Sequence, residues 1–263
     1  MLEELSEEFD ITSVTEQGKE KIKIFVAKEM PVTIILNDQE LVTLLSSPQE
    51  LDCLAIGFLV SEGFLHDKNE IQRVLVDQER GIVRVNTSVK VEMAQEKLFK
   101  RLITSGCGRG ASFYSAADIG EQKVTSEVII KPGEIFNLML KFQKISDVYK
   151  ATHGVHGAAL CTNNDILIFC SDVGRHNAVD RVIGKCILEG IDSSGHILLS
   201  SGRVSSEILH KIVRADIPVI VSITAPTNLG VKIAQQLGVT LVGRVLGQHR
   251  MLIYTNPHRI AEN

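Results

Sequence analysis

Residues 196–223 read HILLSSGRVSSEILHKIVRADIPVIVSI, and this stretch decides the fold class. The apolar run from His196 to Leu199 is typical of a short buried strand, and Pro218 to Ile223 is typical of a second one. Between them, Ser205 to Ala215 carries apolar residues at helical spacing. A strand, a helix and a strand in succession predict a sheet with helices on its faces, so this half of the chain is expected to be α/β.

The same alternation continues on both sides of that stretch. Segments 157–161 and 166–170 flank the turn Asn163-Asn164-Asp165 and predict an antiparallel hairpin. Further helices and strands are expected at residues 175–188, 226–237, 240–242 and 251–254, with a helix starting at 131–134. A hairpin joined to strand–helix units predicts a mixed sheet with helices on both faces, in a domain over residues 131–263.

The N-terminal half has a different pattern. Strands are expected at 21–29, 31–36, 41–45, 71–76 and 82–85, and one helix follows the first three of them. Ser47 is expected to cap this helix, with Pro48 in its first turn and Glu50 completing a capping box. We therefore expect a smaller α+β domain over residues 19–130, which ends in the loop holding Cys107. Residues 1–18 form an acidic leader that is expected to be disordered.

Composition excludes several classes of protein. A net charge of -4 argues against general binding of nucleic acid, which needs a basic surface. No apolar run approaches the ~20 residues that a membrane-spanning helix requires, and the acidic start does not match a secretion signal. The 5 cysteines do not suggest a disulfide framework in a chain of this length. The expected location is the cytoplasm, where thiols stay reduced.

Cys107 is the candidate nucleophile. It stands between glycines in the segment Ser105-Gly106-Cys107-Gly108-Arg109-Gly110, inside a stretch without helical or strand periodicity. Glycines allow the backbone to approach a ligand closely, and a nearby arginine favours the thiolate, the form that attacks sulfur. A small apolar residue in a turn explains the same pattern about as well on the residues alone. The other four cysteines fall on apolar helix faces or at strand ends, which is typical of buried thiols.

Three junctions predict an anion site. The segments 171–177, 200–207 and 223–228 each lead into a helix, and two of them carry a basic residue. Helix N-termini bind phosphates, and ligands of open α/β sheets gather beyond the carboxyl ends of strands. Arg175, His176, Arg203 and Thr224 are therefore candidates for binding an anionic, nucleotide-like ligand, although such polar residues also simply cap helices.

A further basic loop could clamp phosphate or pyrophosphate, with a solvated turn as the alternative. Its residues are Arg244, Val245, Leu246, Gly247, Gln248, His249 and Arg250. His153 and His156 lie three residues apart, but a structural zinc site needs four ligands and usually clustered cysteines, so no metal site is expected.

Together these segments resemble the formate dehydrogenase accessory sulfurtransferase family, FdhD. The matching stretches are SGCG at 105–108, HGVH at 153–156, DVGRHNAVD at 172–180, SGR at 201–203, SITAPT at 222–227 and YTNPHRI at 254–260. The resemblance implies a cytidine deaminase-like fold for the C-terminal domain, and commonly a homodimer. It also implies a sulfur carrier that accepts sulfur from a cysteine desulfurase as a persulfide on Cys107. The sulfur then passes to the bis-molybdopterin guanine dinucleotide cofactor before insertion into formate dehydrogenase, and residues 244–250 match the segment assigned to cofactor binding.

One position departs from the family pattern. Many members carry a Cys-x-x-Cys pair, and Gly110 stands where the second cysteine would be. Cys107 would then act alone, as a persulfide carrier without a resolving thiol. A cofactor-binding chaperone without sulfur transfer is the alternative that this change favours. Deaminase activity is not expected, because the His-x-Glu and Pro-Cys-x-x-Cys motifs of zinc deaminases do not occur here.

Overall fold

The fold is that of a computed structural model, which describes residues 2–88, 102–103, 111–112, 123–247 and 250–262. A six-stranded mixed sheet forms the C-terminal half, as predicted. Its strands, in spatial order, are β10 (Ile166–Asp172), β9 (His156–Cys161), β11 (Ile197–Ser200), β12 (Val219–Ser222), β13 (Thr240–Leu246) and β14 (Arg250–Thr255). The three strands β11, β12 and β13 run parallel, and antiparallel strands flank them on both sides.

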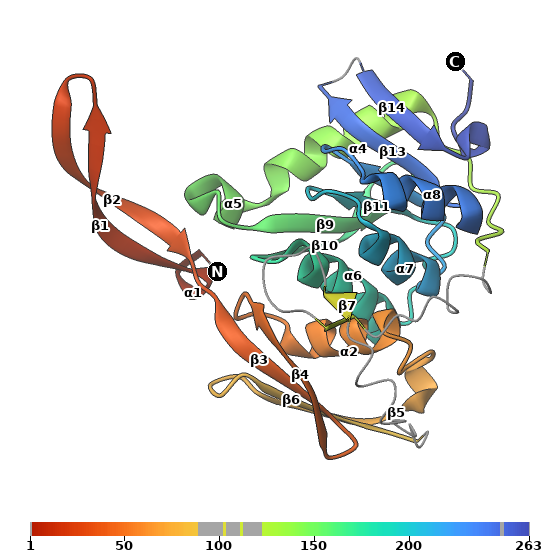
Figure 1. The fold of residues 1–263 in the computed structure, drawn as a ribbon, viewed down its shortest axis with the longest axis horizontal. Coiled ribbons are helices and arrows are strands. Elements are labelled where there is room, and N and C mark those ends of the chain that lie inside the picture. Colours follow the sequence, from red (N-terminus) through yellow and green to blue (C-terminus); the bar gives the residue numbers. More distant parts are fainter. Residues whose placement is uncertain (1, 89–101, 104–110, 113–122, 248–249, 263) are drawn as a thin grey trace.

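Helices cover both faces of this sheet (Figure 1). They are α4 (Pro132–Ile145), α5 (Asp147–Thr152), α6 (Arg175–Glu189), α7 (Ser206–Arg214) and α8 (Asn228–Leu237). The side chains of α6, α7 and α8 share one core cluster with Leu160, Leu198 and Ile220 of the sheet. The inward side chains of α4 share the other cluster with Ala159 and Leu199, which point to the opposite face. The α/β prediction for this half is confirmed.

The N-terminal half packs against the same core. A four-stranded sheet has the order β4 (Gln39–Ser46), β3 (Met30–Leu36), β6 (Ile82–Thr87) and β5 (Ile71–Asp77), with a 3-10 helix, η1 (Lys68–Glu70), before β5. Helix α2 (Leu51–Ser61) lies between this sheet and α6 (Figure 1). A Cβ atom added to Gly57 would lie 1.7 Å from the Asp180 carbonyl oxygen, and one added to Gly184 would lie 1.9 Å from the Cys53 carbonyl oxygen. The two helices therefore cross at glycines, which let their backbones touch.

Four further elements are short. They are α1 (Leu2–Leu5), the paired strands β7 (Leu102–Ile103) and β8 (Ala111–Ser112), and the 3-10 helix η3 (Pro257–Arg259). Among the described residues, no helix is long and apolar enough to cross a membrane.

The expected disordered leader is instead a strand. β1 (Ser6–Thr15) pairs with β2 (Gly18–Ala27) in a two-stranded ribbon that projects from the body of the molecule (Figure 1). Its acidic residues alternate with apolar ones, so that Phe9 lies opposite Ile24 on one face, while Glu8 forms an ion pair of 2.9 Å with Lys23. The high acidic content concealed this alternation.

Ser47 does not cap α2, contrary to the sequence prediction. The helix begins at Leu51, and Glu50 precedes it in the left-handed region with φ 43°. The Ser47 hydroxyl accepts a hydrogen bond from the Val173 amide at 3.1 Å, and the Ser47 amide donates to Asp172 at 3.0 Å. Ser47 therefore pairs with Asp172, 125 positions later in the chain, instead of capping the helix that follows it.

Candidate functional site

The carboxyl ends of four strands meet at one edge of the large sheet. β11, β12 and β13 are parallel, and β10 points the same way because both it and β11 run antiparallel to β9. The turns after β10, β11 and β12 lead into α6, α7 and α8, and the turn after β13 leads into β14, so the three predicted junctions lie together here. Ligands of open α/β sheets bind at this edge.

Backbone and side-chain contacts tie these turns to one another. A Cβ atom on Gly202 would lie 2.8 Å from the Arg175 side chain, so the backbone of the turn after β11 packs directly against that arginine. The Ser222 hydroxyl donates to the Gly202 carbonyl at 2.8 Å, and the Thr224 amide donates to the Ser222 hydroxyl at 3.0 Å. The Arg244 amide donates to the Thr224 carbonyl at 3.0 Å. The structure thus brings Arg175, Thr224 and Arg244 into one connected edge.

Besides Nε2 of His176, two buried polar atoms at this edge lack hydrogen-bond partners among the described residues. They are Nε of Arg175, the first residue of α6, and Oγ of Ser205, which precedes α7. Ser205 is 5% exposed and does not cap its helix. Buried polar groups normally have hydrogen-bond partners, so two orphaned donors beside two helix N-termini suit an anionic ligand.

His176 is buried in its neutral form. Burial first, and then the charges of Lys211 and Arg175, lower the pKa of His176 to about 3. Its Nε2 atom lies 3.3 Å from a Glu207 carboxylate oxygen but is not in hydrogen-bond geometry. A nearby carboxylate would favour the imidazolium, yet burial and the two cations outweigh it. His176 can therefore accept or donate one hydrogen bond but does not supply positive charge.

The predicted basic loop is only partly described. Arg244 and Arg250 are exposed, and Gly247 has φ +59° in the turn between β13 and β14. The Val245 side chain is 2% exposed and packs in the core, so only its backbone can reach a ligand. Gln248 and His249 lie outside the described residues, as do the contacts of the Leu246 side chain. Arg203, at the turn before α7, is exposed.

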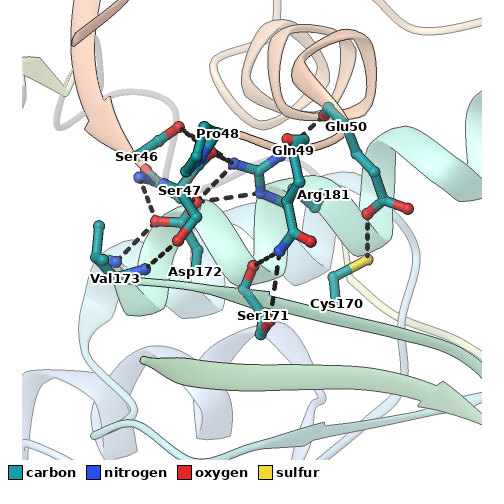
Figure 2. Close-up of polar contacts among 12 residues, drawn as sticks. Ser46, Ser47, Pro48, Gln49, Glu50, Cys170, Ser171, Asp172, Val173 and Arg181 are labelled. Carbon is teal, nitrogen blue, oxygen red and sulfur yellow. Dashed lines mark hydrogen bonds and ion pairs between the residues drawn. The ribbon is translucent and has the colours of Figure 1, made fainter. Parts of the chain in front are cut away.

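Much of the run from Asp172 to Arg181 builds the scaffold of the site (Figure 2). Arg181 is fully buried and donates to Asp172 at 2.7 Å and to carbonyls of residues 47, 49 and 50. The other Asp172 oxygen accepts from Asn177 at 2.9 Å. This network fixes the segment before α2 against the end of β10, and it leaves Arg175 and His176 to face the edge.

The described cysteines are poor nucleophiles. Cys53, Cys161, Cys170 and Cys186 are all free and buried. Burial raises the pKa of Cys53, Cys161 and Cys186 to about 12, and it raises that of Cys170 as well. A thiol needs its thiolate to attack sulfur. Cys107, the fifth cysteine of the sequence, lies outside the described residues, between the paired strands β7 and β8 in the chain.

Comparison with known proteins places the chain in a family. The model of the FdhD/NarQ family matches residues 27–261. The chain belongs to the FdhD/NarQ family. It is 37% identical over 249 residues to the sulfur carrier protein FdhD of Bacillus subtilis, covering 94% of this chain and 95% of that one. It is 39% identical over 238 residues to the protein of the same name from Bacillus pumilus, covering 90% of each chain.

A solved structure supports the same relationship. The formate dehydrogenase accessory protein from Desulfotalea psychrophila has a TM-score of 0.82 and 28% identity, covering 98% of this chain and 100% of that one. The FdhD/NarQ match spans the four-stranded and the six-stranded sheets and begins at the last residue of β2. The family resemblance and the fold expected from it are thereby confirmed.

Sequence reasoning missed three residues of this edge. Ser201 accepts a hydrogen bond from the Gly157 amide at 2.9 Å, Ser205 carries an orphaned hydroxyl, and Glu207 approaches His176. All three lie in the junction 200–207 that the sequence singled out, but only Arg203 was chosen there because it is basic. Which of several serines faces a ligand depends on the turn geometry, which no local pattern reveals.

Proposed function

We propose that this chain is a sulfur carrier required for formate dehydrogenase activity, with Cys107 as the residue that carries the sulfur. One observation carries the assignment: the four described thiols are buried and have raised pKa values, which leaves Cys107 as the cysteine available for exchange. The relatives named sulfur carrier protein FdhD, 37% and 39% identical to this chain, support the general role.

The loading step is an exchange between sulfur atoms. The Cys107 thiolate attacks the terminal sulfur of a persulfide on a cysteine desulfurase. A new S–S bond forms at Cys107, the S–S bond of the desulfurase breaks, and its cysteine leaves as a thiolate. No net oxidation occurs, because one S–S bond replaces another.

The unloading step delivers the outer sulfur to the molybdenum cofactor, bis-molybdopterin guanine dinucleotide, which is the substrate of this protein. Cys107 returns to its thiolate, and the sulfur atom needs two electrons to become sulfide. The metal centre supplies them, or two external thiols do so and leave as a disulfide. Because Gly110 replaces the second cysteine of many family members, no neighbouring thiol of this loop takes part.

The edge of the large sheet fits the anionic part of this substrate. Orphaned Nε of Arg175 and Oγ of Ser205 lie beside the N-termini of α6 and α7, where phosphate groups are favoured. Thr224 and Arg244 border the same edge, where the Arg244 amide donates to the Thr224 carbonyl, and exposed Arg203 lies in the turn before α7. We place the diphosphate of the cofactor there, with His176 as a neutral hydrogen-bonding group.

The partners that follow from this role are a cysteine desulfurase, which loads Cys107, and formate dehydrogenase, which receives the finished cofactor. We also propose a homodimer that acts in the cytoplasm, where thiols stay reduced. The charge of -4 does not favour nucleic acid as a partner.

The test compares Cys107→Ser with Cys186→Ala, which removes a buried thiol on α6. After incubation with a desulfurase and cysteine, intact-mass spectrometry is expected to show an added 32 Da, about one sulfur atom, on the wild type and on Cys186→Ala, but not on Cys107→Ser. Cys107→Ser is also expected to abolish formate dehydrogenase maturation while still binding the cofactor.

The alternative is a chaperone that holds the cofactor without transferring sulfur, and the glycine at position 110 favours it. Under that alternative, Cys107→Ser would support full formate dehydrogenase activity. This result would end the carrier proposal, whereas loss of maturation together with loss of the persulfide would end the alternative.

A further inference from the structure

The ribbon of β1 and β2 has one apolar face and one charged face. In an antiparallel pair, residues directly opposite each other lie on the same side of the sheet. The register of the two strands places five apolar side chains on one side: Phe9, Ile11, Ile22, Ile24 and Val26. The charged residues Glu8, Asp10, Lys19, Lys21 and Lys23 lie on the other side. This division is typical of a sheet that is solvated on one face and packed on the other.

The apolar face of the ribbon is open to solvent. Phe9 is 45%, Val26 42% and Ile24 37% exposed, and Ile11 and Ile22 are half-buried. None of the five joins a hydrophobic core cluster of the described residues, and the ribbon projects from the body of the molecule (Figure 1). An isolated two-stranded ribbon is only marginally stable in water. A surface that covers this apolar face would therefore stabilise the ribbon.

The base of the ribbon is anchored to the rest of the chain. Leu5, Val148 and Val155 form a small buried cluster, and Ala27 at the end of β2 packs against it. The Lys28 amide donates to the Leu5 carbonyl at 2.9 Å. Folding the ribbon back onto its own body would break these contacts, so the cover for the apolar face comes from another molecule.

Charge is distributed unevenly along the ribbon. The segment at its base is acidic, with Glu3, Glu4, Glu7 and Glu8. Near the tip, Lys19 and Lys21 balance Glu16 and Glu20. If two ribbons pack face to face about a two-fold axis and run antiparallel, the acidic base of each lies beside the lysines at the tip of the other. A parallel packing would bring the two acidic bases together, and like charges across an interface are unfavourable.

We propose that the apolar face of the ribbon packs against the same face of a second copy of this chain, with the two ribbons antiparallel. A two-fold contact joins one surface patch to itself, and a uniformly apolar face is complementary to itself in this way. Ile11 and Ile22, which pair at the middle of the ribbon, lie nearest the axis. This inference rests on the proposed function, because it names the surface that joins the two copies of the proposed homodimer.

The experiment measures the dissociation constant of the full-length dimer by sedimentation equilibrium, with light scattering to give the mass. Phe9→Lys and Ile24→Lys each place a charge on the apolar face. Each is expected to raise the dissociation constant about 30-fold or more, the scale for loss of a central interface residue. Val14→Lys is the matched control, because Val14 is 67% exposed on the opposite face and the change in charge is the same. It should leave the dissociation constant unchanged.

A second measurement uses the wild type alone, so that it does not depend on the folding of a variant. Hydrogen–deuterium exchange is followed above and below the dissociation constant. The amides of residues 6–15 and 18–27 are expected to exchange more slowly in the dimer, whereas those of the central strands β11 and β12 should exchange at the same rate in both states. Circular dichroism melting of the three variants confirms that the body of each remains folded.

Three results would overturn the proposal. One is a wild type that stays monomeric at every concentration, and another is equal dimerisation of Phe9→Lys, Ile24→Lys and Val14→Lys. The third is exchange in the ribbon that does not change between monomer and dimer.

These outcomes are separate from those of the sulfur-carrier test. A dimer that survives Phe9→Lys and Ile24→Lys would leave the homodimer standing and remove only the ribbon from its interface. Persulfide formation on Cys107 is read by mass, so it can succeed whether or not the ribbons pair. If the ribbons pair as expected but no persulfide forms on Cys107, the carrier role fails while the ribbon interface stands.

Discussion

The distribution of thiols allows a quantitative test by alkylation. Cys53, Cys161, Cys170 and Cys186 are buried, whereas Cys107 stands in a glycine-rich segment of the sequence, two positions before Arg109. Treatment of the folded protein with iodoacetamide is therefore expected to modify one thiol per chain at an appreciable rate. The count of reactive thiols is measured on the wild-type protein, and Cys107→Ser then identifies which thiol has reacted.

The expected rate difference follows from the pKa values. With a pKa of about 12, Cys53, Cys161 and Cys186 are each ionised to roughly 3 parts in 100,000 at pH 7.5, since each unit of pKa is tenfold. An unperturbed thiol with a pKa near ~8.5 is about 10% ionised at the same pH. Because the thiolate is the reactive form, the buried thiols should react at least ~1,000-fold more slowly than Cys107. Restricted access adds to this difference.

The assay is intact-mass spectrometry over time at pH 7.5. We expect one adduct on the folded wild type, none on Cys107→Ser, and 5 on the wild type in guanidinium, in agreement with the number of cysteines in the sequence. A second thiol that is modified in the folded protein at a rate within tenfold of the first would refute the reasoning. So would a fast adduct that persists on Cys107→Ser.

Three further predictions concern the stability of the folded protein and its dependence on pH. Arg181→Met should lower the free energy of unfolding by about 4 kcal/mol in urea denaturation, because the buried carboxylate of Asp172 is left with an unpaired charge. The control Arg80→Met, at an exposed ion pair, should change the free energy of unfolding by under ~0.5 kcal/mol. Equal effects of the two variants would contradict the structural role of Arg181. Gly57→Ala should cost about 3 kcal/mol because its Cβ would lie 1.7 Å from a carbonyl oxygen, whereas Gly133→Ala, with open space around it, should be neutral in the same assay. Burial lowers the pKa of His176 from 6.5 to about 3, so below pH 6.5 only the unfolded chain takes up this proton and stability should fall with decreasing pH, by up to about 1.4 kcal/mol per unit until about pH 3. His176→Gln should flatten that slope in denaturation curves measured from pH 6 to pH 4, and an unchanged slope would show that other groups cause it.

The architecture of the second half followed from local patterns. Short apolar runs and helical spacing are properties of a few neighbouring residues, and glycines such as Gly238, with φ +76°, mark where a helix ends. These signals do not depend on distant contacts. The strand and helix assignments between residues 157 and 255 therefore agree with the structure to within a few residues.

Features that depend on distant contacts could not be predicted. Ser47 has the local features of a helix cap, yet its partner is the turn after β10, 125 residues later. The stretch from Asp172 to Asp180 carries part of the family resemblance, and the sequence suggested Arg175 and His176 within it as ligand-binding residues. Asp172, Asn177 and Arg181 instead bond to one another and to the segment before α2. Residue type alone cannot separate a buried structural arginine from one that faces a ligand.

The burial of Arg181 also has a consequence for biosynthesis. Helix α2 is buried along almost its whole length, and the carbonyls just before it accept hydrogen bonds from Arg181, a residue about 130 positions later in the chain, in addition to local ones. At ordinary translation rates the ribosome needs roughly 10 s to make that interval. During this time the nascent N-terminal half exposes an apolar helix without its covering partner, which makes it a natural client for chaperones that act at the ribosome. Truncation near residue 130 would make that exposed state permanent.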